Sequence, residues 1–386
     1  MLTCQKHLFS LPEDVVYLNC AYMGPLPEAV ELAGYEGVAR KTLPFEITAA
    51  DFFTGVALLK SLFARLIHTD DAERVAIIPS VSYGIANVVR NVKAQKGQNI
   101  VLVDEIFPSN YYPWKRLADE TGAELRVVGA PKTATGRGAA WNEKIMEAID
   151  CQTVAASVPM NHWADGTLFD LAAFRKRTRE LGALMIVDGS QSVGALPFDV
   201  QELQPDALIC VGYKWMLGPY GLGMAYYGSY FDDGAPIEEN WMNRLESENF
   251  QALVNYQPMY KPKAHRYCVG ENSQFVSVAM QTASLKMILD WGVENIQAYC
   301  RQLSAPYCEK FSALGCSVEG PAHRSGHLFG IRLPGGVDLE QLKKEAQAAN
   351  VFVSFRGNAV RISPNVYNDE HDFEKLLLVL KSVLKS

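Results

Sequence analysis

From about Arg74 to Gly228 the chain alternates short apolar runs with amphipathic stretches, and this alternation limits its possible folds more than any other feature. The predicted strands are Val75–Ile78, Ile100–Val103, Leu125–Val128, Thr153–Val158, Leu184–Val187, Leu208–Val211 and Met224–Tyr227. Helical patterns lie between most of them, at Tyr83–Lys93, Tyr111–Thr121, Asn142–Ile149 and Leu171–Leu181. Strands that alternate with helices predict an α/β fold with a mostly parallel sheet. Because the strands are apolar rather than alternating, we expect helices to cover both faces.

The pattern changes after Gly228. Residues 229–270 are rich in Tyr, Asn, Glu and Pro and predict irregular structure, and a long helical stretch follows from Val276 to Leu314 with a break near Trp291. The rest predicts a smaller α+β unit, with strands His327–Leu333, Val351–Phe355 and Ala359–Ile362 and helices Leu339–Ala349 and Glu370–Lys385. We therefore expect an N-terminal segment over residues 1–25, a large α/β domain over 26–260 and a small C-terminal domain over 261–386.

Composition and charge exclude several classes of protein. Of 386 residues, 48% are hydrophobic and 20% are charged, which is typical of a globular chain. A net charge of −7 argues against nucleic acid or an anionic membrane as partner. No apolar run is long enough for a transmembrane helix, and the first residues do not resemble a signal peptide, so we expect a cytoplasmic protein. The eight cysteines show neither CxxC nor zinc spacing, so we expect buried thiols and no metal site.

Two charged residues stand where strands of the predicted sheet end, and ligands of open α/β sheets bind beyond these carboxyl ends. Asp188 follows the run Leu184–Val187, and Lys214 follows Leu208–Val211. A desolvated carboxylate needs a cationic partner, and a lysine in such a place has a depressed pKa or forms a Schiff base. Pyridoxal phosphate (PLP) needs an acid for its ring nitrogen and a lysine for its aldehyde. The pair therefore predicts a PLP site, although each residue alone is also typical of a helix cap or a surface lysine.

A phosphate cradle and a ring-stacking residue can be proposed on the same basis. Ser80, Val81 and Ser82 follow a predicted strand and open a helix, where N–H groups and hydroxyls bind anions. Phe107 follows another strand, where it could stack on a cofactor ring or simply pack in the core. No GxxxxGK[ST] or HExxH motif occurs, and the glycines at 218–223 precede a strand instead of a helix. A nucleotide- or nicotinamide-dependent protein is therefore disfavoured.

The run VDGSQSVGALPFDVQELQPDALICVGYKWMLGPYGLG resembles the PLP-binding region of the class V aminotransferase family, which includes cysteine desulfurase, kynureninase and isopenicillin epimerase. Further runs resemble the family's N-terminal segment (YLNCAYMGPLP), phosphate loop (PSVSYGIANVV) and C-terminal segment (RGNAVRISPNVYN), so the resemblance extends over most of the chain. It implies the PLP-dependent transferase fold (aspartate aminotransferase-like, fold type I), with a seven-stranded sheet in the large domain. It also implies a homodimer with active sites at the interface.

The resemblance implies roles for individual residues. Lys214 would hold PLP as an internal aldimine and move the proton of the substrate Cα, while Asp188 would pair with the pyridine nitrogen and Gln191 with the phenolic oxygen. The remaining implied roles are phosphate binding by Val81, Ser82, Ser190 and Tyr213, ring stacking by Phe107, and substrate binding by Arg361, Asn19 and His162. The family's subunit-crossing Gly-Thr-x-Pro/Asn motif is replaced by Gly270–Ser273, where Ser273 or Asn272 would contact the partner subunit's phosphate site. Arg361 would clamp the substrate carboxylate through a bidentate pair. Which of Asn161, His162 and Trp163 faces the cofactor is left open.

Departures from the family pattern bear on the reaction. Cysteine desulfurases carry a nucleophilic cysteine shortly before the carboxylate-binding arginine, and no cysteine follows Cys316 here, which disfavours a persulfide-forming enzyme. The run FPSNYYPW resembles kynureninase, but Gln191 stands where kynureninase usually has histidine. We expect an aminotransferase acting on a small L-amino acid and a 2-oxo acid. The alternatives are a β-lyase or C–C-cleaving enzyme, an epimerase-like racemase, and a non-catalytic protein, which the presence of Lys214, Asp188 and Arg361 disfavours.

Overall fold

The computed structural model describes residues 2–133, 136–357 and 359–384. At its centre is a seven-stranded sheet in the order β2-β8-β7-β6-β5-β3-β4. Its strands are β2 (Val75–Ile78), β3 (Asn99–Val103), β4 (Glu124–Val128), β5 (Thr153–Pro159), β6 (Leu184–Asp188), β7 (Ala207–Val211) and β8 (Gly223–Tyr227). Only β8 runs antiparallel to its neighbours β2 and β7, and the other neighbouring strands pair in parallel. The mostly parallel sheet is confirmed, and no strand end differs from its predicted position by more than one residue.

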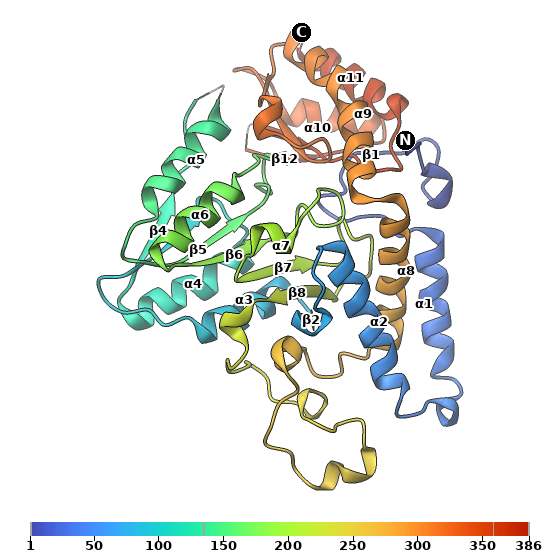
Figure 1. The fold of residues 1–386 in the computed structure, drawn as a ribbon. Helices are drawn as coiled ribbons and strands as arrows, with labels where there is room; N and C mark the ends of the chain where they lie inside the picture. Colours follow the sequence, from blue (N-terminus) through green and yellow to red (C-terminus); the bar gives the residue numbers. More distant parts are fainter. Residues whose placement is uncertain (1, 134–135, 358, 385–386) are drawn as a thin grey trace.

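Helices cover the sheet on both sides (Figure 1). The helices that connect successive strands are α3 (Val81–Asn91), α4 (Pro108–Thr121), α5 (Arg137–Ala148), α6 (Leu171–Leu181) and the short α7 (Val200–Leu203). Another layer, formed by α1 (Glu28–Arg40), α2 (Asp51–Leu66) and α8 (Phe275–Trp291), packs beside the β2 edge. Helix α3 begins two residues earlier than predicted because the Ser80 hydroxyl caps it, accepting from the Tyr83 N–H at 3.2 Å. Pro108 likewise starts α4 at the first helical position, where its missing N–H is tolerated.

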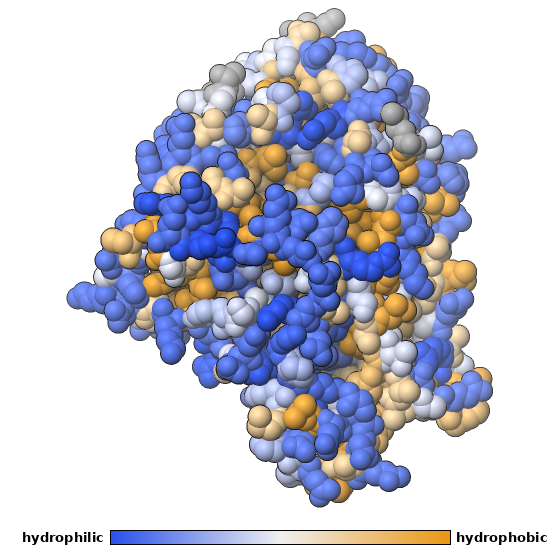
Figure 2. All heavy atoms as spheres, in the orientation of Figure 1, coloured by the Kyte–Doolittle hydropathy of each residue, from blue (hydrophilic) through white to orange (hydrophobic). Residues whose placement is uncertain are grey.

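Within the described chain, residues 229–270 contain short 3₁₀ turns and the isolated bridge of Arg244 with Tyr260, in agreement with the predicted irregular structure. The part from residue 237 to residue 260, which we call the arm, projects away from the body at the bottom of Figure 1. Figure 2 shows hydrophobic side chains among hydrophilic ones at its surface. Val254 is 80% exposed and Tyr256 is 97% exposed. The arm therefore presents apolar surface that one copy of the chain does not bury.

The small domain contains a four-stranded sheet in the order β12-β13-β10-β9. Its elements are β9 (Ser317–Val318), β10 (Phe329–Arg332), α10 (Leu339–Ala348), β12 (Ser354–Arg356), β13 (Ala359–Ile362) and α11 (Glu370–Leu384). The predicted strand Val351–Phe355 is in fact divided, because β11 (Val351–Phe352) pairs with β1 (Val16–Tyr17) from the N-terminal segment. The expected end of the last helix, Lys385, lies outside the described residues.

The boundary between the two hydrophobic cores lies within α9 (Val293–Ala313), although Leu328, Val366 and Tyr367 return to the core of the large domain; we expected the small domain to begin at residue 261. Residues of α8 and Cys300 of α9 pack into the core of the large domain, whereas Leu303, one turn further along α9, packs into the core of the small domain. The N-terminal segment contributes to both cores and so links the two domains. Within the described residues, no helix has the length and apolar character needed to cross a bilayer.

Candidate active site

Two adjoining cavities lie beyond the carboxyl ends of the parallel strands, where the sheet predicts a ligand site. The inner cavity has a volume of about 290 Å³, and the residues assigned to the cofactor that line it are Val81, Phe107, Asp188, Ser190, Gln191, Tyr213 and Lys214. The outer cavity, of about 410 Å³, shares Lys214 and Phe107 with the inner one and is also lined by Arg361. A larger hollow of about 870 Å³ beside α6 and α7 contains none of these residues. The predicted chemistry therefore converges on the two smaller cavities.

Asp188 ends β6 with its side chain almost completely buried. Its Oδ1 accepts a hydrogen bond from the Ser190 N–H at 3.0 Å, and its Oδ2 lies 3.5 Å from Nδ2 of Asn110. The amide oxygen of Asn110 accepts from Ser157 and Trp114, which turns the amide N–H groups toward Asp188. The sequence analysis missed Asn110, because a single asparagine in a helix carries no local signal of a buried contact.

Lys214 follows β7 and is also buried, at 7% exposure. Burial lowers the pKa of Lys214 to about 8, although the negative charge of Asp188 acts in the opposite direction. The Lys214 ammonium lies 5.5 Å from the centre of the Phe107 ring. Behind it, a Cβ atom at Gly24 would overlap the Lys214 carbonyl oxygen, so only glycine lets the N-terminal segment pack this closely. An amine with this pKa can react with an aldehyde and exchange protons near neutral pH.

The other end of the inner cavity fits a phosphate group. The hydroxyl of Ser190 is buried and, among the described residues, has no hydrogen-bond partner. Val81 is the first residue of α3, so its N–H belongs to the free N-terminal turn of that helix. Ser80 lines the cavity, whereas Ser82 is exposed and its hydroxyl lies 2.9 Å from that of Ser80. An unpaired buried hydroxyl beside a helix N-terminus fits the phosphate of PLP.

The walls between these two ends are held by further contacts. Gln191 donates from Nε2 to the carbonyl oxygen of Ala21 at 3.2 Å and accepts from Trp215 Nε1 at 3.0 Å. The Tyr213 ring packs against Tyr220, with ring centres 4.6 Å apart. These contacts fix the side chains at the cavity wall, and their roles toward the cofactor stay predictions.

Arg361, on β13, reaches the outer cavity from the small domain. It donates from Nη1 to the carbonyl oxygen of Trp163 at 2.7 Å and from Nη2 to the Ser354 hydroxyl at 3.1 Å. Ser354 in turn donates to Oδ1 of Asn19 at 2.8 Å, so Asn19 contacts Ser354 and does not line either cavity. Burial, together with the charge of Arg356, lowers the pKa of Arg361 to about 9. No carboxylate pairs with Arg361 among the described residues.

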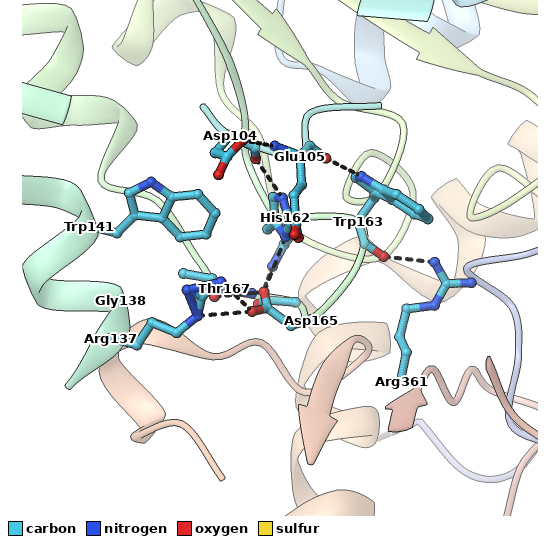
Figure 3. A network of polar contacts seen from close by, with 12 residues as sticks. Asp104, Glu105, Arg137, Gly138, Trp141, His162, Trp163, Asp165, Thr167 and Arg361 are labelled. Atoms are coloured by element: carbon cyan, nitrogen blue, oxygen red, sulfur yellow. Dashed lines mark hydrogen bonds and ion pairs between the residues drawn. The ribbon is translucent and has the colours of Figure 1, made fainter. Parts of the chain in front are cut away.

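His162 is fully buried in a different set of contacts, shown in Figure 3. Its Nε2 lies 3.2 Å from the Asp104 carbonyl oxygen and its Nδ1 lies 3.3 Å from Oδ1 of Asp165. The residues of this turn that face the inner cavity are Asn161 and Trp163. The sequence analysis assigned His162 to substrate binding, but in the structure His162 lines neither cavity.

Asp165 is the centre of the contacts in Figure 3 and was also missed from the sequence. It pairs with Arg137 of α5 at 3.2 Å and with Arg332 of β10 at 2.5 Å, so it joins the large domain to the small one. Burial would raise the pKa of Asp165, but a hydrogen bond with His162 and the charge of Arg137 hold it below its usual range.

Ser273, assigned to the partner subunit's phosphate site, lies just before α8 and is buried at 8% exposure. It lines neither cavity of its own chain, so its assignment stays a prediction.

The part of the chain that the structure describes holds no group of three or more His, Cys, Asp or Glu side chains placed to bind a metal ion. All eight cysteines are free, and most of them are buried.

The sequence comparisons identify one family, and the solved structures show a similar fold. The family model for class V aminotransferases matches residues 46–376. An uncharacterised aminotransferase of Schizosaccharomyces pombe is 25% identical over 330 residues, covering 83% of this chain and 80% of the relative. A cysteine desulfurase of Yersinia pseudotuberculosis is 28% identical over 393 residues, covering 97% and 94%. Among solved structures, a variant of C-DES with glycine covalently linked to its PLP cofactor superposes with a TM-score of 0.87 at 18% identity, covering 99% of this chain and all of that one.

Proposed function

The chain belongs to the class V aminotransferase family and has its PLP-dependent fold type I, and from this premise we propose that it is an aminotransferase of a small L-amino acid and a 2-oxo acid. The observation that carries the proposal is the convergence of Lys214, Asp188 and Arg361 on two adjoining cavities. Among the described residues that line these cavities, none is a cysteine.

The cofactor is PLP, and the residues of the inner cavity fit it. Val81 and Ser190 would hold its phosphate, Asp188 its pyridine nitrogen and Lys214 its aldehyde carbon. Bound PLP supplies an electron sink for the electron pair left at the substrate Cα when the proton departs.

The chain's own residues then divide the work on the substrate. The Arg361 guanidinium binds the α-carboxylate in a bidentate pair, which orients the Cα–H bond in the cavity. The Lys214 amine takes the proton from the substrate Cα. In amino transfer it returns this proton to an atom other than that carbon. Its depressed pKa of about 8 keeps a fraction of the amine neutral near physiological pH, as a general base requires.

The state of the nearby thiol favours transfer over thiol-dependent desulfuration. The Cys20 thiol contacts the lysine backbone, donating from Sγ to the Lys214 carbonyl oxygen at 3.7 Å. Burial raises the pKa of the Cys20 thiol to about 12, so it is protonated at neutral pH and is a poor nucleophile. A β-elimination, C–C cleavage or racemisation that needs no thiol would use the same three residues, and the products distinguish these reactions.

The test is an assay of the PLP-loaded protein with a panel of L-amino acids, with and without 2-oxo acids. Amino transfer predicts that the donor alone converts the cofactor to its pyridoxamine form, detected by mass spectrometry. With an acceptor present, a new amino acid should accumulate. Release of ammonia and a 2-oxo acid without acceptor would replace the proposal with a lyase, and formation of D-amino acid with a racemase. Lys214→Ala is the control and should give none of these products.

We also propose that the working enzyme is a homodimer. Its support is apolar surface that is too exposed for a lone chain to favour: Phe45 is 80% exposed, Tyr35 and Val38 on α1 are 65% and 57% exposed, and the arm exposes Val254 and Tyr256. Ser273 can contact the phosphate site of a second copy only if the dimer places Ser273 at that copy's cavity.

A further inference from the structure

A second arginine lines the outer cavity beside Arg361. Arg356 ends β12, which pairs antiparallel with β13, and the register sets Ser354 opposite Arg361. Residues two apart on a strand share a face, as do directly opposed residues, so Arg356 and Arg361 project from the same face of this hairpin. They occupy diagonal positions, roughly 7–8 Å apart at the backbone. Both guanidinium groups therefore reach one cavity from neighbouring strands.

The protein leaves both positive charges without an anion. Among the described residues, neither Arg356 nor Arg361 takes part in an ion pair, and the Nε atom of each is buried with no hydrogen-bond partner. Arg356 donates from Nη1 only to the carbonyl oxygen of the adjacent Phe355, at 2.8 Å. Arg356 is partly buried, and this burial lowers the pKa of its guanidinium. A cation withdrawn from water, as Arg361 is fully and Arg356 partly, is costly unless an anion accompanies it, and a substrate α-carboxylate supplies only one anion for the two arginines.

Trp163 holds the Arg356 side chain at the cavity. The guanidinium lies 5.2 Å from the centre of the indole ring, in a cation–π contact. The indole is itself fixed, because its Nε1 donates to the Glu105 carbonyl oxygen at 2.6 Å and its ring packs edge-to-face against Phe107. A stacked guanidinium keeps its outer N–H groups free for a planar anion and loses little freedom when it binds one.

The cofactor does not account for Arg356. The phosphate cradle lies in the inner cavity, at Val81 and Ser190, and Arg356 does not line that cavity. It lines only the outer one, with Arg361. An anion at Arg356 would therefore belong to the substrate.

We propose that Arg356 binds a second carboxylate, on the side chain of the substrate, so that the donor is an acidic amino acid and the acceptor a dicarboxylic 2-oxo acid. This inference rests on the proposed function, since it places the α-carboxylate on Arg361. It narrows the substrate class from small L-amino acids to amino dicarboxylates.

Binding of unreactive acids to the PLP-loaded protein tests the subsite without turnover. Calorimetry compares succinate with butyrate, and glutarate with valerate, which differ only in the second carboxylate. At least one dicarboxylate should bind about tenfold or more tightly than its monocarboxylate, the effect of one charge-assisted interaction. In Arg356→Gln this difference should vanish while monocarboxylate affinity stays within about twofold, and Arg356→Lys should recover part of it. Arg90→Gln, an exposed arginine on α3, is the matched control and should match the unsubstituted protein.

Two outcomes overturn the subsite: equal affinity for both classes of acid in the unsubstituted protein, or an equal loss of both classes in Arg356→Gln. Thermal unfolding of each variant shows whether it is folded. If dicarboxylates bind preferentially but no donor transfers its amino group, the proposed function fails and the subsite stands. If neutral amino acids are transferred and dicarboxylates have no advantage, only the subsite fails.

Discussion

Arg361 donates a hydrogen bond from Nη1 to the backbone carbonyl oxygen of Trp163 across 2.7 Å. This contact joins the small domain, which carries the arginine, to the turn at residues 161–167 of the large domain (Figure 3). The same turn is anchored by Asp165, which pairs with Arg137 and Arg332. The position of the Arg361 guanidinium, which we propose binds the substrate carboxylate, therefore depends on a carboxylate that does not line either cavity.

Asp165→Asn should weaken substrate binding and stability together. It leaves Arg137 and Arg332 without their counter-charge in a site where Asp165 is 9% exposed, so the free energy of unfolding should fall by about 3 kcal/mol. A loosened turn should displace Arg361 and raise KM for the amino acid about tenfold, with a smaller change in kcat. Urea unfolding and steady-state kinetics measure the two effects.

Asp119→Asn is the matched control, because Asp119 pairs with Lys115 on the surface, where water screens the pair, so its loss should leave the free energy of unfolding nearly unchanged. If Asp165→Asn lowers stability but leaves KM unchanged, Asp165 holds the domains together without positioning Arg361.

The reactivity of Lys214 should report its depressed pKa. Only a neutral amine attacks an aldehyde, so labelling of the apoprotein by a small aldehyde and borohydride should rise with pH and reach half its maximum near pH 8. Asp188→Asn should move the midpoint lower, because the Asp188 charge raises the pKa of Lys214. Peptide mapping by mass spectrometry gives the labelled fraction at each lysine.

Lys115 is the internal control for this profile. Its hydrogen bond to Asp119 raises the pKa of Lys115 above the ordinary value of 10.5, so its labelling should begin at higher pH than that of Lys214. Coincident profiles for the two lysines would contradict the buried environment assigned to Lys214.

The sheet could be predicted from the sequence because strand and helix periodicities are local properties. An apolar run such as Leu184–Val187 predicts a buried strand from the local sequence alone. A charged residue at its end is conspicuous because burying a charge is unfavourable. The division of Val351–Phe355 could not be predicted, since it depends on pairing with Val16–Tyr17, far away in the chain.

The site shows the same limit. The local sequence marks Asp188 and Lys214 as unusual, because each is a charge that follows an apolar strand. The sequence around Arg361 is that of an ordinary strand arginine, and its role was predicted only from the family resemblance. Asn110 and Asp165 acquire their roles from partners on other elements, Asn110 from Asp188 and Asp165 from Arg332. No local pattern marks a residue whose function is to hold another residue in place.

The state of association tests the exposed apolar surface. Light scattering after size exclusion should give the mass of two 42.7 kDa chains. If the arm contributes, Val254→Asp with Tyr256→Asp should shift the protein toward monomer, because charge at a buried apolar contact is unfavourable. Leu378→Asp, exposed at 62% on α11 and distant from the arm in the chain, is the control and should not shift the mass. A monomeric unsubstituted protein at micromolar concentration would contradict the dimer.

Ser190→Ala should weaken binding of the cofactor without lowering the stability of the apoprotein. In the apoprotein the Ser190 hydroxyl is buried without a partner among the described residues, so its removal should leave the free energy of unfolding unchanged or raise it by about 1 kcal/mol. In the PLP-loaded protein the same change should remove the donor that we propose for the phosphate, and Kd for PLP should rise about tenfold. Urea unfolding of the apoprotein and fluorescence titration with PLP measure the two quantities, and Ser382→Ala, in α11, is the control. A destabilised apoprotein with unchanged PLP affinity would show that the hydroxyl serves the fold instead of the cofactor.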